Sequence, residues 1–406
     1  NTCWDSHECT GRAEITTGCK FCPNHSRCGL EYVVQRVFGE EGPAITLPSL
    51  YRAIPIDRRD PFIDRDDNLC ILCGRCVRAC AEQSFTCTLD FLYRGGEARV
   101  GTAFNRTLAE SDCRFCGACV DACPTGTLAE RVRRWEGPAD ERVATTCSFC
   151  SIGCQFDLGI RNDRVIESIP RKDGETGERE ACTRGRFAVV EFLRSVRRLR
   201  TPLVRRGGEL IEVPWETALE VAAEGIRTAD PERSALVYSG SCTNEDVFVA
   251  HKFARDVLKT PNVDSSVRLS YGPLLGAGGT SAPQARLSDL LEAEAVLVIG
   301  GDPDFSHTVL ALMIERAAME GRTRLVLVGP YGTRLSDYAA CDVRHAPGEE
   351  RQLLEWLHKR LSGGEGGEPR EDVDGAAGVL ETAKGQGSVV VVYGACLLYT
   401  SPSPRD

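Results

Sequence analysis

A cysteine spacing that occurs twice constrains this chain more than any other feature of its sequence. The pattern C-x2-C-x2-C-x3-C returns 43 residues after its first copy, and both copies have Cys-Gly at the second cysteine. Three close thiolates on one loop can bind three corners of a 4Fe–4S cubane. The eight cysteines of the two runs are Cys70, Cys73, Cys76, Cys80, Cys113, Cys116, Cys119 and Cys123.

The fourth cysteine of each run predicts an exchange of ligands between two clusters. We expect it to begin a helix that leads away from its loop, so that it reaches the other cluster. The first cluster would then be bound by Cys70, Cys73, Cys76 and Cys123. The second would be bound by Cys80, Cys113, Cys116 and Cys119. Structural zinc is the alternative, but zinc usually takes two spaced pairs of ligands.

Two further cysteine groups lie on either side of this repeat. One joins a tight group to a distant cysteine and suits a third cubane, although its spacing also fits zinc. Its members are Cys147, Cys150, Cys154 and Cys182. The other group, Cys19, Cys22 and Cys28, needs a fourth ligand. Among the candidates His7, Cys3, Cys9 and His25 we favour His7.

Composition excludes several other classes of cysteine-rich protein. The 21 cysteines are bunched, whereas a secreted disulfide protein would spread them over loops. The net charge of −10 argues against nucleic acid as the main partner. Neither an export signal nor a membrane span is visible, and we expect a reducing, cytoplasmic compartment. Cys87, Cys242 and Cys341 fit no spacing, and we expect small buried hydrophobic side chains there.

Cysteines become rare after residue 182, where strands and helices begin to alternate. Buried strands are expected at residues 234–240, 294–300, 323–329 and 389–392. Helices are expected at residues 244–258, capped by Thr243, and at 307–319. This alternation predicts a parallel sheet covered on both faces. The expected fold class is therefore α+β ferredoxin-like cluster modules followed by an incomplete α/β domain.

The chain is expected to divide into five segments. They are a His/Cys cluster module at 1–60, a ferredoxin-type domain with two 4Fe–4S clusters at 61–135, a third 4Fe–4S domain at 141–198, a truncated α/β domain at 199–395, and a tail at 396–406. The tail resembles a translated sequencing adapter, with a natural polar tail as the alternative. Because the chain also begins without Met, we expect a fragment cut at both ends.

The order of the cysteine groups resembles the soluble formate dehydrogenase alpha subunits. These are molybdopterin guanine dinucleotide oxidoreductases related to the G subunit of respiratory complex I. The resemblance implies a molybdopterin-binding domain at 199–395, a 2Fe–2S module before residue 1 and a His-Cys3 cluster at Cys19–Cys28. In that family the His lies four residues before the first Cys, where this chain has Ile15. The choice of His7 therefore departs from the family pattern.

The resemblance also implies cofactor-binding residues. The segment Cys182-Thr-Arg-Gly-Arg-Phe187 places Arg184 where the family keeps a cation between the third cluster and the pterin. A fixed charge there would tune the cluster and hold pterin oxygens, whereas the alternative is a solvated basic stretch. Other segments resemble turns at strand ends and helix N-termini that bind phosphates. The residues implied there are Asn244, Arg268, Gly300, Asp302, Pro303 and His307.

The resemblance breaks down where formate dehydrogenases bind metal and substrate. Ser270 and Tyr271 stand where the family has Cys or selenocysteine followed by His. A Ser alkoxide can bind molybdenum or tungsten, but Tyr cannot replace His as a proton carrier near neutral pH. Tyr331 stands where the family has a formate-binding Arg, and Asp302 where it has Asn. These departures argue against formate oxidation by the standard mechanism.

Three functions are compatible with this pattern. The favoured one is an iron–sulfur electron-transferring subunit of a molybdopterin-dependent oxidoreductase, with Ser270 as a possible metal ligand and another substrate than formate. The second is a non-catalytic electron relay, as in the related complex I protein. The third is a zinc-rich structural protein. For the first two, the redox partner would be a flavin subunit using NAD, a ferredoxin or a hydrogenase.

Overall fold

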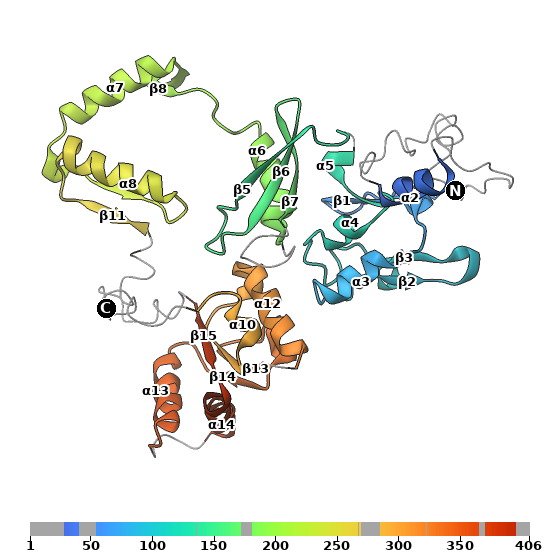
Figure 1. Cartoon of the computed structure of the whole chain (residues 1–406). Coiled ribbons are helices and arrows are strands. Elements are labelled where there is room, and N and C mark those ends of the chain that lie inside the picture. Colours follow the sequence, from blue (N-terminus) through green and yellow to red (C-terminus); the bar gives the residue numbers. More distant parts are fainter. Residues whose placement is uncertain are drawn as a thin grey trace. The chain divides into compact units, whose positions relative to one another are not determined.

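The computed structural model describes residues 28–39, 54–134, 136–171, 181–266, 268, 285–321, 323–364 and 370–394. The chain divides into two compact units. Figure 1 labels most of their helices and strands. The first unit comprises the chain up to Arg194 together with Leu287–Ala293 and Pro303–Thr323. The second comprises Ser195–Arg286, Glu294–Asp302 and the chain from Arg324 onward.

Short strands and helices surround the two cysteine runs in the first unit. The strands form two antiparallel pairs, β1 (Ile63–Arg65) with β4 (Leu128–Glu130) and β2 (Asp90–Leu92) with β3 (Arg99–Gly101). The helices α3 (Arg75–Glu82) and α4 (Ala118–Ala122) pack against each other. The other short elements here are α2 (Gly29–Phe38), η2 (Asp67–Leu69), η3 (Gly95–Glu97), η4 (Ala103–Asn105) and α5 (Arg131–Arg134).

The Cys-Gly dipeptide of each run turns its cysteine loop into a helix. Gly74 precedes α3 with φ +71° and Gly117 precedes α4 with φ +81°, a left-handed conformation that favours glycine. The expectation that the fourth cysteine begins a helix was wrong. Cys80 lies in the last turn of α3, and Cys123 is the residue that caps the end of α4.

A three-stranded antiparallel sheet follows, in the order β5-β6-β7. Its strands are β5 (Glu141–Thr146), β6 (Gln155–Arg161) and β7 (Arg164–Pro170). The β5–β6 register brings Cys147 next to Cys154, and the Cys147 amide donates to the Cys154 carbonyl at 2.8 Å. The unit is completed by η5 (Arg184–Ala188), α6 (Val189–Arg194), α10 (Asp289–Glu292), α11 (Pro303–Ser306) and α12 (Thr308–Met319).

The second unit contains an all-parallel sheet in the order β14-β13-β12-β15. Its strands are β12 (Ala295–Ile299), β13 (Arg324–Gly329), β14 (Cys341–Arg344) and β15 (Val389–Tyr393). A core that includes Val326, Val343, Leu357 and Leu380 joins these strands to α13 (Glu350–Leu361) and α14 (Glu371–Gln386). The short helix η9 (Arg334–Tyr338) lies between β13 and β14 in the chain.

The region between residues 203 and 268 forms smaller structures within this unit. A hairpin of β8 (Leu203–Arg206) and β9 (Glu209–Glu212) precedes α7 (Trp215–Arg227) and η6 (Pro231–Arg233). The strand β10 (Leu236–Tyr238) then pairs in parallel with β11 (Val263–Ser265). Between them lie α8 (Asn244–Phe253) and η7 (Ala254–Leu258).

The predicted alternation of strands and helices is confirmed. All four expected strands are present as β10, β12, β13 and β15, and Thr243 forms a capping box with Asp246 at the start of α8. Within the described residues, however, β10 and β11 form a separate pair instead of extending the four-stranded sheet. The prediction missed α14, whose three glycines are poor helix formers.

Two smaller expectations meet different outcomes. Cys87 and Cys242 are exposed, so the prediction that they are buried hydrophobic residues was wrong. Cys341 is half-buried and donates a hydrogen bond to the Asp372 carbonyl at 3.1 Å. In the part of the chain that the structure describes, no helix combines the length and the apolar character needed to span a membrane.

Candidate cluster-binding sites

The first predicted ligand set surrounds a single pocket. Its four cysteines line this pocket together with Val100, Pro124 and Leu128. Burial, with the charges of the neighbouring thiols, raises the pKa of Cys76 to about 12. A thiol in such surroundings stays protonated unless a metal takes the place of its proton. The lining cysteines are Cys70, Cys73, Cys76 and Cys123.

The second predicted set is more deeply buried. Burial, with the charges of the nearby Cys116 and Cys80 thiols, raises the pKa of Cys113 to about 12. Burial also raises the pKa of Cys119, and the charges of Cys116, Cys113 and Cys80, with that of Cys76 from the first set, add to the effect. The side chains of Cys80, Cys113, Cys116 and Cys119 are therefore neighbours. The Phe115 amide also donates to Cys113 Sγ at 3.3 Å, as amides do around cluster sulfurs.

The third set joins the end of the β5–β6 hairpin to the segment before η5. Burial raises the pKa of Cys154 to about 12, and Cys147, Cys150 and Cys182 all contribute through their charges. Gly185 approaches this group closely, because a Cβ there would lie 3.5 Å from Cys147 Sγ and 2.7 Å from the Phe156 ring.

These donor sets fit 4Fe–4S clusters. Each set offers four cysteine thiols, which matches the four thiolates that bind a cubane. In the described part of the chain, no three Cys, His, Asp or Glu side chains converge closely enough to hold a single metal ion. Cys28 donates to the Pro124 carbonyl at 2.9 Å, which places it beside the first set. Cys19, Cys22 and His7 lie outside the described residues.

Arg184 and His307 meet beside the third set. Arg184 Nη2 donates to the Ser306 carbonyl at 2.5 Å, and its charge counteracts the effect of burial on the pKa of Cys147. Burial and then the Arg184 charge lower the pKa of His307, so that its ring stays neutral near pH 7. His307 Nε2 also lies 3.3 Å from Ser151 Oγ, a residue that the sequence did not single out.

The other predicted cofactor residues are more dispersed. Asn244 begins α8 and is exposed, and Arg268 is exposed and pairs with Asp264 at 2.7 Å. Gly300 and Asp302 follow β12 in the second unit, whereas Pro303 begins α11 in the first. Ser270 and Tyr271 lie outside the described residues.

Sequence reasoning missed a buried arginine behind the second set. The Arg186 side chain is fully buried and donates to Glu130 at 2.7 Å and to Asp121 at 2.9 Å. Its stem occupies the space beside Gly117, where a Cβ would lie 2.7 Å from Arg186 Nε. Burial raises the pKa of Glu130 to about 7 despite this ion pair. The Cys182–Phe187 motif contained the signal, but it drew attention only to Arg184.

Aromatic side chains extend this contact. Phe187, next to Arg186, stacks on Phe62 with ring centroids 5.2 Å apart. Phe62 in turn meets Phe115 of the second run edge to face at 5.5 Å. The segment after Cys182 therefore packs on the second cysteine loop through both a cation and a ring.

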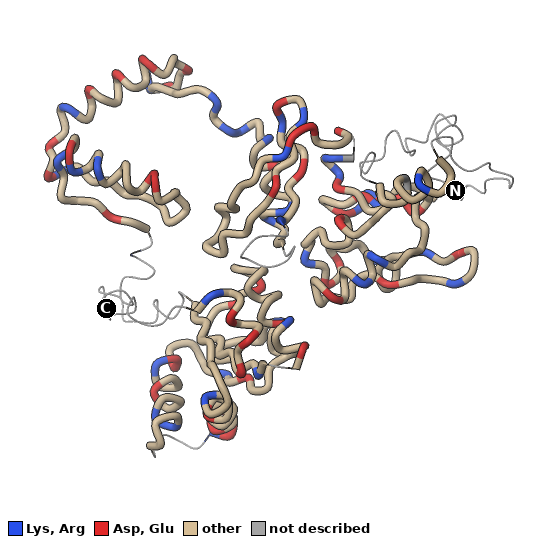
Figure 2. The backbone as a smooth tube through the Cα atoms, in the orientation of Figure 1, with Lys and Arg blue, Asp and Glu red and all other residues tan. Residues whose placement is uncertain are grey.

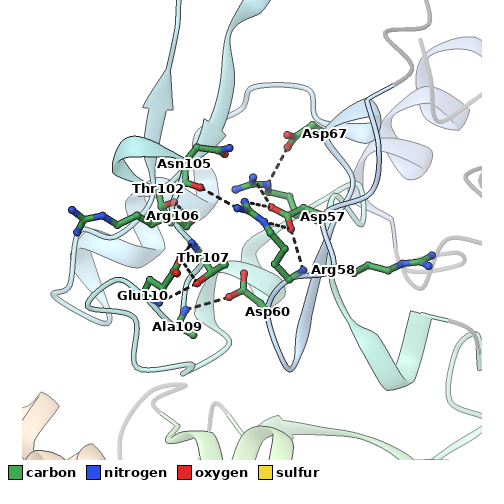
Figure 3. Close-up of polar contacts among 12 residues, drawn as sticks. Asp57, Arg58, Asp60, Asp67, Thr102, Asn105, Arg106, Thr107, Ala109 and Glu110 are labelled. Carbon is green, nitrogen blue, oxygen red and sulfur yellow. Dashed lines mark hydrogen bonds and ion pairs between the residues drawn. The ribbon is translucent and has the colours of Figure 1, made fainter.

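Polar contacts join the segment before the first cysteine run to the segment before the second (Figure 3). Asp60 accepts a hydrogen bond from the Ala109 amide at 3.2 Å, and Arg59 donates to the Asn105 carbonyl at 3.2 Å. The hydrogen bonds from Arg59 lower the pKa of Asp57 to about 2. The segment before the first run thus fixes the segment before the second.

The arginines between residues 184 and 206 do not form one solvated stretch. Arg184 and Arg186 are engaged in the contacts above, whereas Arg197, Arg198 and Arg200 are exposed. Figure 2 shows the basic residues that follow α6. Arg184 therefore differs from these exposed arginines in its hydrogen bond to Ser306, and its role toward a pterin stays a prediction.

Three protein families match consecutive parts of the chain. Residues 60–129 match the ferredoxin-like domain of NADH-quinone oxidoreductase subunit 3, and residues 140–191 match the molybdopterin oxidoreductase Fe4S4 domain. Residues 198–362 match the molybdopterin oxidoreductase family itself.

Curated relatives include several kinds of oxidoreductase. NADH-quinone oxidoreductase subunit 3 of Thermus thermophilus is 31% identical, with 83% of this chain and 46% of the relative covered. NADPH-Fe(3+) oxidoreductase subunit alpha of Geobacter sulfurreducens is 31% identical over 74% of this chain and 36% of its own length. F420-dependent formate dehydrogenase 1 subunit alpha of Methanococcus maripaludis is 33% identical over 52% of this chain and 32% of its own length.

The chain spans less than half the length of each of these relatives. Its order of domains nevertheless agrees with the order of the cysteine groups and the parallel sheet described above. The chain carries a ferredoxin-like domain and the Fe4S4 and main domains of the molybdopterin oxidoreductases, and its homologues include formate dehydrogenase alpha subunits and NADH-quinone oxidoreductase subunits.

Proposed function

We propose that this chain is the iron–sulfur electron-transferring part of a molybdopterin-dependent oxidoreductase. One observation carries the proposal: three groups of four cysteine thiols, of which the third lies beside Arg184 and His307. Iron–sulfur clusters bound there would carry single electrons. We also propose that its redox partner is a flavin subunit that uses NAD, a ferredoxin or a hydrogenase.

The ligand sets and their number are part of this proposal. Three 4Fe–4S clusters would use the twelve cysteines from Cys70 to Cys182, and a fourth cluster would use Cys19, Cys22, Cys28 and His7. The contact of Cys28 with Pro124 supports a route from the fourth cluster to the first. A 2Fe–2S cluster in sequence before residue 1 stays a prediction from the family resemblance.

The chain's own residues would orient a pterin at the third site. Arg184, which donates to the Ser306 carbonyl, would hold the pterin oxygens with a fixed charge, while the neutral His307 ring would accept or donate a hydrogen bond. Bound molybdopterin would supply two-electron chemistry at its metal. Ser270 stays a predicted metal ligand.

A relay without a pterin is the second candidate. It is favoured by the Tyr271 and Tyr331 departures and by the Thermus NADH-quinone oxidoreductase subunit 3, which matches more of this chain than the formate dehydrogenase does. In this case the α/β domain would serve as a scaffold for the cluster chain.

Metal and pterin analysis of the full-length protein, purified without oxygen, distinguishes the two. We expect iron and acid-labile sulfide together with molybdenum or tungsten and a fluorescent oxidised pterin. Iron and sulfide without molybdenum, tungsten or pterin would replace the first candidate by the relay. Zinc in place of iron and sulfide would contradict both.

A further inference from the structure

Arg114 lies inside the second cysteine loop, and its buried side chain has no counterpart in the first run. It follows Cys113, and its side chain is only 4% exposed. The equivalent residue of the first run is Ile71, which is exposed. A buried cation one residue from a cluster ligand calls for a physical reason, because burial of a charge is costly unless it is paired.

Two carboxylates supply that pairing. Glu315 of α12, itself fully buried, accepts two hydrogen bonds from the Arg114 guanidinium at 2.5 and 2.7 Å. Asp304 of α11 lies 2.9 Å from Arg114 Nε. An arginine guanidinium stays protonated in proteins, so Arg114 and its two carboxylate partners form a charged cluster.

The same arginine touches both ligand segments of the second site. Its Nη1 donates to the Ser84 carbonyl at 3.2 Å, and the Ser84 hydroxyl donates to the Cys80 carbonyl at 2.7 Å. Arg114 thus connects the loop of Cys113 and Cys116 with the segment that carries Cys80. A charge held in this position acts on the whole ligand set.

Arg114 also joins the second site to the third. The Thr183 hydroxyl donates to the Arg114 carbonyl at 2.7 Å, and Thr183 directly follows Cys182. One hydrogen bond between neighbours of Cys113 and Cys182 therefore connects the two ligand sets. An electron could leave one cluster and enter the other along this contact while the hydroxyl keeps its proton.

We propose that the buried Arg114–Glu315 pair sets the reduction potential of the second cluster site and so decides whether an electron rests there or passes to the third. The inference rests on the proposed function. A cluster becomes more negative when it is reduced, so a nearby cation stabilises the reduced state and a nearby carboxylate opposes it. The two partners therefore act in opposite directions.

The test is an EPR-monitored redox titration of the full chain carrying its clusters, with the second-site signal identified by its loss in Cys116→Ala. Glu315→Gln removes a negative charge, and we expect the second site to shift to higher potential. Arg114→Gln removes the cation, and we expect a shift to lower potential. Arg114→Lys keeps the charge and should restore most of the wild-type value.

Glu167→Gln is the matched control. Glu167 is equally buried and also pairs with two arginines, Arg133 and Arg142, which lie outside the cysteine loops. It should lower stability without moving the second-site potential. Asp304→Asn changes a more exposed partner and should shift that potential upward even where the buried variants fail to fold.

Shifts of the same sign in Glu315→Gln and Arg114→Gln would show a merely structural role and overturn the inference. No shift in the folded Glu315→Gln or Asp304→Asn protein would overturn it too, while leaving the proposed function intact. A wild-type chain without a second-site signal would overturn both.

Discussion

The two cysteine runs have the same spacing and backbone but very different surroundings. Both turn through a positive-φ residue before the second cysteine, Leu72 at φ 55° and Phe115 at φ 48°, and both use a left-handed Gly next. In the first run Ile71 and Leu72 are 41% and 39% exposed. In the second run Arg114 is buried in ion pairs, and Phe115 packs against Phe62.

The comparison indicates that the cysteine spacing determines the backbone conformation of the loop, whereas the residues between the cysteines determine how deeply it is buried. The second run is enclosed by Arg186, Phe187 and Glu315, which come from segments far along the chain. We therefore expect substitutions around the second run to cost much more stability than equivalent substitutions around the first.

The largest effect is expected for Arg186→Met. This change leaves Glu130 and Asp121 without their buried cation, and loss of one partner of a buried pair costs about 3–5 kcal/mol. Urea unfolding followed by circular dichroism measures the change in the free energy of unfolding. Arg78→Met in the first run changes an exposed side chain and should cost about 0.5 kcal/mol or less. Equal losses in both variants would contradict the comparison.

Alanine at the two glycines gives the next largest difference. Either change should cost about 1–2 kcal/mol, because both positions have positive φ. Gly117→Ala should cost about 1–3 kcal/mol more. The new Cβ would lie 2.7 Å from the Arg186 side chain, which is fully buried and cannot move aside without straining its neighbours. At Gly74 the nearest atom is in the exposed Phe91 ring at 3.1 Å. Thermal unfolding of the two variants measures the difference. A lower melting temperature for Gly74→Ala than for Gly117→Ala would contradict the prediction.

Phe115→Ala and Leu72→Ala compare the matched apolar positions. Phe115 is partly buried and loses its contact with Phe62, so we expect a cost of about 2 kcal/mol. Leu72→Ala should stay within about 0.5 kcal/mol. Denaturant midpoints measure both, and a larger loss for Leu72→Ala would show that the first run is also enclosed.

The smallest expected effect is a pH dependence at Glu130. Its pKa is about 7 in the folded chain and 4.5 for an ordinary Glu, so folding binds a proton between these values. Stability contributed by this group is therefore lost as pH rises from 4.5 through 7. Glu130→Gln should remove that loss, on the order of 1 kcal/mol after allowance for the Arg186 pair.

Glu136→Gln is the control, since the Glu136 carboxylate also pairs with an arginine but stays partly exposed. The free energy of unfolding should be measured at several pH values for both variants and the wild type. An unchanged slope in Glu130→Gln would exclude Glu130 as its source.

Much of the fold could be predicted, because strand and helix patterns are local. The strands at 294–300 and 323–329 have continuous apolar runs, and Thr243 is a recognisable N-cap. The environments of the cysteine sets could not be predicted in the same way. Arg114 finds Glu315 201 residues away, and Arg186 finds Glu130 56 residues away, so no local pattern announces either pair.

Low-temperature EPR of the reduced chain tests the central claim, that the two runs exchange their fourth cysteines. Cys80→Ala lies in the first run but should remove the signal of the second site. Its difference spectrum from the wild type should therefore coincide with that of Cys116→Ala. A difference spectrum that coincides with that of Cys73→Ala would show that Cys80 belongs to the first site and would contradict the account.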